Sequence, residues 1–140
     1  MRVISLAERP RSEAVREAVE LLKGGGVAAF PTETFYGIGI RYDDGPALAR
    51  LYSLKGRPED KAMPLIIGER EDLQILTEKV SPVAEILMNK FWPGPLTLLF
   101  EARAGLPDLL TAGTGKVAVR IPGASLALDI ARAIPFPLTA

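Results

Sequence analysis

The sequence contains neither histidine nor cysteine among its 140 residues. Without these residues the chain cannot form a Ser-His-Asp or Cys-His catalytic system, a disulfide, or a structural zinc site with the usual ligands. Oxygen-ligated magnesium remains compatible with the composition. The sequence therefore favours chemistry in which lysine, arginine, hydroxyl and carboxylate side chains align substrates and neutralise charge.

An excess of one charge and long apolar runs are also missing. Seventeen basic and seventeen acidic residues give a formal net charge of zero, so any contact with nucleic acid must depend on a local patch. No apolar run approaches the roughly 20 residues of a membrane span. The opening residues, MRVISLAERPRSEAV, lack the apolar stretch of a secretory signal. We therefore expect a soluble, cytoplasmic protein with no membrane contact.

Strand and helix patterns alternate along a chain that has the length of one domain. Strands are predicted over residues 2–7, 27–30, 37–40, 64–68, 96–102, 116–121 and 136–140. Helices are predicted over residues 12–26, 46–56, 70–76, 81–92 and 125–134. Ser12 and Ser81 are the expected caps of two of these helices. This alternation predicts an α/β architecture.

Hydrogen-bonding side chains cluster in the segment FPTETFYGIG, residues 30–39, where a buried strand ends. Thr32, Thr34 and Tyr36 stand beyond the strand, at a position where α/β folds commonly bind ligands. Their hydroxyl groups are suited to hold the polar groups of a ligand. An ordinary turn, in which threonine satisfies nearby backbone groups, accounts for the pattern equally well.

Basic residues stand out in two further segments. LKGRPEDK brings Lys55, Arg57 and Lys61 together after a helix, either as solvated charges at its C-terminus or as a turn that binds a polyphosphate. In KVAVRIP, alternation places Arg120 on the face opposite Val117, Val119 and Ile121. That face is either solvated or part of a cleft in which arginine binds a carboxylate, and periodicity does not distinguish the two.

A fourth segment, FWPGPLT, ends an apolar helix pattern. We interpret Phe91 and Trp92 as core residues rather than as base-stacking residues. Thr97 is either a ligand contact or an ordinary strand residue.

Taken in this order, FPTETFYGIG, LYSLKGRPEDKAMPLII, FWPGPLTLLF and VAVRIP resemble the YrdC-type threonylcarbamoyl-adenylate synthase family, from about residue 27 to the last residue. The resemblance implies a twisted mixed sheet with flanking helices around a deep, positively lined cavity. It also implies a nucleotidyl transfer in which L-threonine, bicarbonate and ATP give threonylcarbamoyl-AMP and pyrophosphate. By the same resemblance, other tRNA-modification proteins would use this product to form threonylcarbamoyladenosine, and magnesium would accompany the ATP.

The resemblance also assigns roles to single residues. It implies that Lys55 and Arg57 act in catalysis and bind the nucleotide, and that Lys61 and Thr139 are further nucleotide contacts. The residues implied to bind threonine are Thr32, Thr34, Tyr36 and Arg120. Cations at this site suit the chemistry, because a carbamate must approach the α-phosphate of a polyanion.

The family pattern continues into a Ser-x-Asn segment beyond the point where this sequence stops at Ala140. We therefore expect residues 1–140 to form a single YrdC-like domain that is truncated at its C-terminus. An unfinished last strand would expose a sheet edge, which suggests a homodimer. Alternatives are a non-catalytic relative that binds tRNA or double-stranded RNA, a regulatory relative with the same fold, and an adenylating enzyme that uses carbamoyl phosphate.

Overall fold

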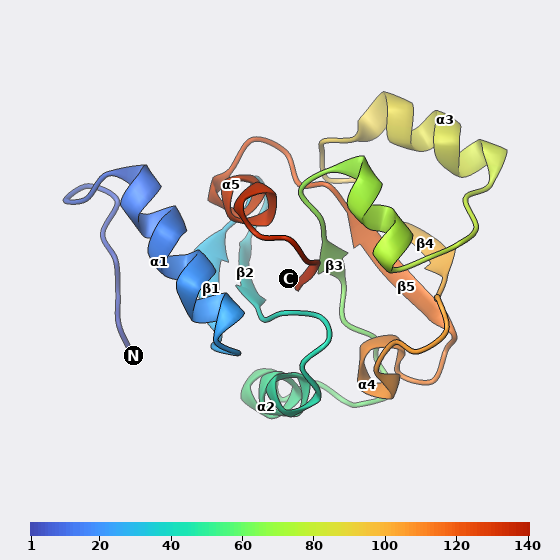
Figure 1. Cartoon of the computed structure of the whole chain (residues 1–140), viewed down its shortest axis with the longest axis horizontal. Helices are drawn as coiled ribbons and strands as arrows, with labels where there is room; N and C mark the ends of the chain where they lie inside the picture. Colours follow the sequence, from blue (N-terminus) through green and yellow to red (C-terminus); the bar gives the residue numbers. More distant parts are fainter.

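The computed structural model describes residues 1–140, in which helices and strands alternate (Figure 1). The helices are α1 (Arg11–Lys23), α2 (Gly45–Lys55), the 3-10 helix η1 (Arg70–Ile75), α3 (Pro82–Phe91), α4 (Asp108–Thr111) and α5 (Leu126–Ala133). The strands are β1 (Ala28–Pro31), β2 (Tyr36–Gly39), β3 (Leu65–Ile66), β4 (Leu98–Glu101), β5 (Lys116–Arg120) and β6 (Leu138–Thr139). None of the helices combines the length and apolar character that crossing a membrane requires.

The central sheet is mixed, as the family resemblance implies. Its strand order is β4-β5-β3-β6, with β3 and β5 parallel and the other two pairs antiparallel. Strands β1 and β2 form a separate antiparallel hairpin. The segment after β2 connects the two sheets, because the Thr139 amide donates to the Ile40 carbonyl oxygen at 3.0 Å and Arg41 bridges Leu138. Strand β6 therefore lies between the hairpin and the rest of the sheet.

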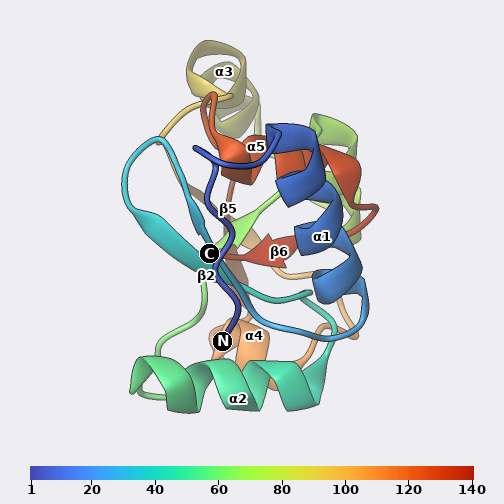
Figure 2. The same cartoon turned by 90° about the vertical axis from the view of Figure 1, so that its left-hand side faces the viewer.

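Two apolar clusters hold these layers together. Helices α1 and α5 pack beside each other against β1, and their buried side chains include Leu22, Phe30 and Ile130. The larger cluster lies under α2 and α4 and against β3 and β5, where Leu51 and Val119 are fully buried. Helix α3 lies at one end of the molecule, and α2 and α4 lie at the other (Figures 1 and 2). The buried residues of α1 and α2, among them Leu22 and Leu48, face these clusters.

Several local predictions are wrong. Residues 2–7 form no strand, and Val3 is 78% exposed. The predicted helix over residues 70–76 is a 3-10 helix, and α4 was not predicted because four residues carry little periodicity. Ser12 lies inside α1, which begins at Arg11 without a side-chain cap. Ser81 is confirmed as a cap, since its hydroxyl accepts from the Ala84 amide at 3.1 Å.

The two aromatic residues predicted as core differ in burial. Trp92 is partly buried against the larger cluster, with its Nε1 donating to the Leu96 carbonyl oxygen at 2.8 Å and its ring 6.3 Å from that of Phe100. Phe91 is 43% exposed, so the prediction that it is a core residue is wrong. Phe91 is the last residue of α3, a helix with only one fully buried side chain, that of Met88. Thr97 is exposed just before β4.

Candidate functional site

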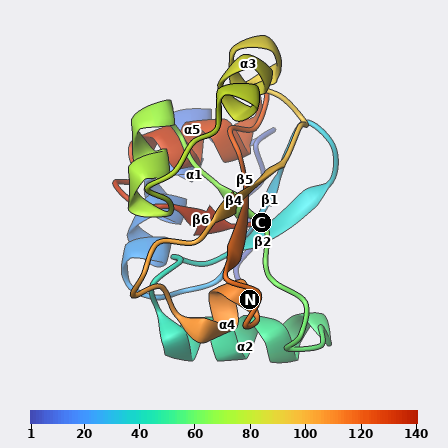
Figure 3. The same cartoon turned by 90° about the vertical axis from the view of Figure 1, so that its right-hand side faces the viewer.

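The predicted site residues come from four parts of the fold. The turn between β1 and β2 and the loop between α2 and β3 project on the same side of the molecule, with the C-terminus between them (Figures 2 and 3). Backbone contacts connect them, because the Ala140 amide donates to the Pro64 carbonyl oxygen at 3.1 Å and Gly37 lies against Ala140. Arg120 at the end of β5 completes this group, which we call the open face.

The turn between β1 and β2 is organised by one hydroxyl. Thr32 Oγ1 accepts from the amides of Thr34 and Phe35, both at 3.1 Å, and lies 2.5 Å from the Phe35 carbonyl oxygen, to which it donates. Thr32 therefore acts as a turn residue, the second of the two interpretations of its sequence. Thr34 and Tyr36 are exposed, Tyr36 by 76%, and both remain available to a ligand.

We expect Thr32→Ala to lower the free energy of unfolding by about 1 kcal/mol, because two turn amides lose their acceptor. Thr32→Ser keeps the hydroxyl and should recover most of the loss. Urea unfolding of both variants measures the difference. An unchanged unfolding midpoint for Thr32→Ala, together with weaker ligand binding, would contradict the turn role and favour a ligand contact.

Arg57 is engaged with its own loop. Its Nε donates to the Lys61 carbonyl oxygen at 3.0 Å, and its Nη2 donates to that of Ala62 at 2.8 Å. The loop starts at Gly56, which caps α2 with a left-handed backbone at φ 55°. The expected turn after the helix is therefore confirmed. To contact a nucleotide, Arg57 must release one or both carbonyl groups or use its remaining N–H groups.

Lys55, the last residue of α2, is half-buried and forms no ion pair. Burial lowers the pKa of Lys55, and the neighbouring positive charge of Arg57 lowers it further. Lys61 is exposed in the same loop. The positive charges of Lys55, Arg57 and Lys61 thus lie in one segment, and no carboxylate is paired with Lys55. A bound anion would reduce the repulsion between these charges.

Arg120 does lie on the face opposite Val117, Val119 and Ile121, all of which are buried. Its Nη1 lies 2.7 Å from Glu33 Oε1, and only 13% of the Arg120 side chain and 18% of that of Glu33 are exposed. The Arg120 guanidinium is therefore mostly buried and is paired with a carboxylate of its own chain. The sequence alone indicated no separate role for Glu33, because its partner Arg120 lies 87 positions away and no local pattern connects the two residues.

Thr139 is buried rather than open to a ligand. Its exposed fraction is 0%, and its hydroxyl accepts from the Ile40 amide at 3.1 Å. The reason is the position of β6 between β3 and the segment after β2. The Thr139 hydroxyl thus completes the sheet, and it would have to leave the Ile40 amide to bind a nucleotide, so this contact stays a prediction.

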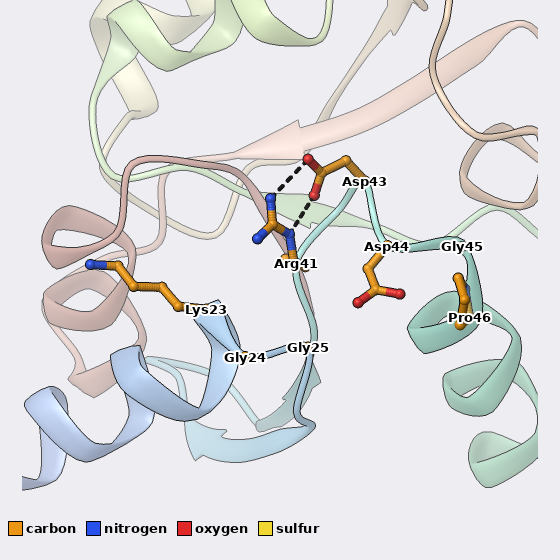
Figure 4. A pocket seen from close by; sticks show the side chains of 8 residues that line it. All are labelled: Lys23, Gly24, Gly25, Arg41, Asp43, Asp44, Gly45 and Pro46. Atoms are coloured by element: carbon orange, nitrogen blue, oxygen red, sulfur yellow. Dashed lines mark hydrogen bonds and ion pairs between the residues drawn. The ribbon is translucent and has the colours of Figure 1, made fainter.

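Two surface hollows lie elsewhere. One, of about 470 Å³, is lined by residues of the α1–β1 and β2–α2 connections, where Arg41 pairs with Asp43 through two bonds of 2.6 and 3.0 Å (Figure 4). Asp44, beside them, caps α2 by accepting from the Ala47 amide. The other hollow, of about 500 Å³, lies between η1 and α3. None of the predicted site residues lines either hollow, so the expected cavity coincides with neither.

The chain has no group of three or more acidic side chains placed to hold a metal ion.

Most of the chain matches a known protein family. A family model described as "Telomere recombination", for Sua5, YciO and YrdC proteins, matches residues 20–140. The chain belongs to the Sua5–YciO–YrdC family. Its mixed sheet and flanking helices agree with this family, as the sequence resemblance predicts.

Curated relatives and a solved structure extend the comparison. The chain is 36% identical over 138 residues to the threonylcarbamoyl-AMP synthase of Pyrococcus abyssi, covering 99% of this chain and 41% of that protein. It is 37% identical to the Klebsiella pneumoniae threonylcarbamoyl-AMP synthase, covering 91% of this chain and 68% of that protein. A crystal structure of P. abyssi Sua5 complexed with L-threonine superposes with a TM-score of 0.86 at 37% identity, covering 90% of this chain and 37% of that one. The chain thus spans about two fifths of the Pyrococcus protein.

Proposed function

We propose that this member of the Sua5–YciO–YrdC family makes threonylcarbamoyl-AMP. In the balanced reaction, L-threonine, bicarbonate and ATP give threonylcarbamoyl-AMP, pyrophosphate and water. The observation that carries the proposal is the 36–37% identity to threonylcarbamoyl-AMP synthases across almost the whole chain. The threonine complex of the Pyrococcus relative supports threonine as the amino-acid substrate.

The cation cluster suits the reaction. A carbamate oxygen attacks the α-phosphorus of ATP, and the bond to pyrophosphate breaks, so the site must bring two anions together. We assign Lys55, which has no carboxylate partner, to the phosphates, and Lys61 adds charge from the same loop. Arg57 joins them by turning from its loop carbonyl groups. We assign the remaining cation, Arg120, to the threonine carboxylate.

The product is a mixed anhydride, which a following enzyme must intercept before water does. We propose that it serves threonylcarbamoyladenosine formation on tRNA in the cytoplasm, together with other tRNA-modification proteins. Its substrates are then ATP, carried with magnesium, L-threonine and bicarbonate.

Pyrophosphate release tests this function. We expect the chain to release pyrophosphate from MgATP only when both L-threonine and bicarbonate are present, and calorimetry to detect binding of MgATP and of threonine. ATP-dependent use of carbamoyl phosphate in place of threonine and bicarbonate would contradict the proposal. So would a folded chain that binds neither ATP nor threonine, or one that binds RNA with strong salt dependence and no requirement for ATP.

A further inference from the structure

One buried polar atom on the open face has no partner. Glu33 Oε2 is buried and makes no hydrogen bond, whereas Oε1 of the same carboxylate is bonded to Arg120. It is the only buried side-chain nitrogen or oxygen atom in the chain without a partner. Leaving a buried carboxylate oxygen unsatisfied destabilises the folded protein, so such an atom calls for a functional explanation.

Arg120, by contrast, has guanidinium N–H groups that are not used in the bond to Glu33. A guanidinium carries five N–H groups, and only Nη1 has a recorded bond, to Glu33. Since no Arg120 nitrogen is among the buried atoms without a partner, the unused N–H groups are accessible. Arg120 can therefore bind a second carboxylate without releasing Glu33.

The surroundings hold Glu33 in place while leaving its oxygen able to turn. A Cβ atom on Gly123 would lie 3.2 Å from Glu33 Cγ, so the glycine makes room for this side chain. Glu33 stands in the turn organised by Thr32, whose tip is exposed. The Glu33 side chain is 18% exposed, and the terminal torsion of glutamate has a broad energy minimum, so the carboxylate can rotate about this torsion.

Charge balance identifies the ligand group that fits. The Arg120–Glu33 pair is neutral, and a ligand with only a carboxylate would place two negative charges around one guanidinium. A zwitterionic amino acid avoids this repulsion, because its ammonium supplies the donor that Oε2 lacks. We propose that Glu33 is a specificity residue that binds the α-ammonium of the amino acid while Arg120 binds its carboxylate. This inference rests on the proposed function and concerns the complex before the amine reacts with bicarbonate.

The test pairs one residue change with one ligand change. Calorimetry compares L-threonine with 2,3-dihydroxybutanoate of matching stereochemistry, in which a hydroxyl replaces the ammonium. The parent chain is expected to bind threonine about tenfold or more tighter than the hydroxy acid, because a hydrogen bond between charged groups is lost. In Glu33→Gln, which keeps an oxygen for Arg120, threonine binding should weaken about tenfold and the preference should fall below about threefold. Glu20→Gln, an exposed glutamate on α1, controls for the same change in net charge.

Four results would overturn the inference. If Glu33→Gln binds threonine more tightly than the parent, the carboxylate competes with the ligand for Arg120. If both ligands weaken equally and the melting temperature falls, Glu33 only supports the hairpin. If the parent binds threonine and releases pyrophosphate but the variant keeps its preference for threonine, the inference fails while the proposed function stands. A parent that binds no threonine refutes both.

Discussion

Replacing Lys55 with methionine is expected to weaken MgATP binding by about tenfold or more and to slow pyrophosphate release by about a hundredfold or more. Lys55 lies at the end of α2, half-buried, with no anionic partner. Methionine keeps an unbranched stem of similar size and removes only the charge that would meet the phosphates. Calorimetry and a pyrophosphate assay measure the two effects.

The same variant should not be destabilised. Folding lowers the pKa of Lys55 through burial and the charge of Arg57, so the folded state disfavours the ammonium. That destabilisation is fully present below the folded-state pKa and disappears as the pH rises past the unfolded-state value. At neutral pH the melting temperature of Lys55→Met should therefore equal or exceed that of the parent, and the difference should shrink in alkaline solution.

Lys23 provides a matched control, because it is also the last residue of a helix and is also followed by glycine. Lys23→Met should leave MgATP binding unchanged. If the two variants weaken binding equally, general positive charge attracts the nucleotide and Lys55 has no particular contact with it. If Lys55→Met binds MgATP as the parent does, the nucleotide does not bind at this end of α2.

The largest expected loss of stability comes from Gly68→Ala. A Cβ atom at this position would lie 2.5 Å from the Ala131 carbonyl oxygen and 2.7 Å from the Arg132 Cα, both in the backbone of α5. Because no side-chain rotation relieves a contact with backbone, we expect a loss of about 3 kcal/mol. In a chain of this length the melting temperature should fall by roughly 10 °C. Thermal and urea unfolding provide the measurements.

Gly45→Ala is the control for this change, since nothing lies within 4 Å of the position that its Cβ would occupy. Its stability should be unchanged or slightly higher than that of the parent, because alanine restricts the unfolded chain. A Gly68→Ala variant as stable as Gly45→Ala would show that α5 can move away from the end of β3. A movement at the end of β3 would also affect the open face, because the Ile67 amide donates to the Arg120 carbonyl oxygen at 3.1 Å.

The sequence predicted helices correctly where their position depends on residues close together in the chain. The helices predicted over residues 12–26 and 46–56 correspond to α1 and α2, and Ser81 was correctly predicted as a cap. These features depend on residues three or four positions apart. The strand predicted over residues 2–7 failed because β propensity requires a neighbouring strand, and no strand pairs with this segment.

The chemical types at the open face, and the family to which they belong, could be read from the order of the four motifs. Contacts between distant residues could not. Arg120 and Glu33 are 87 positions apart, and Ile40 and Thr139 are 99 apart, so the ion pair and the buried threonine exist only once β5, β6 and the hairpin are assembled. Periodicity indicates on which face of a strand a side chain lies, but it does not indicate which distant residue that side chain contacts. The engaged guanidinium of Arg57 and the unpartnered oxygen of Glu33 therefore emerged from the folded structure, because each depends on how the backbone closes around the side chain.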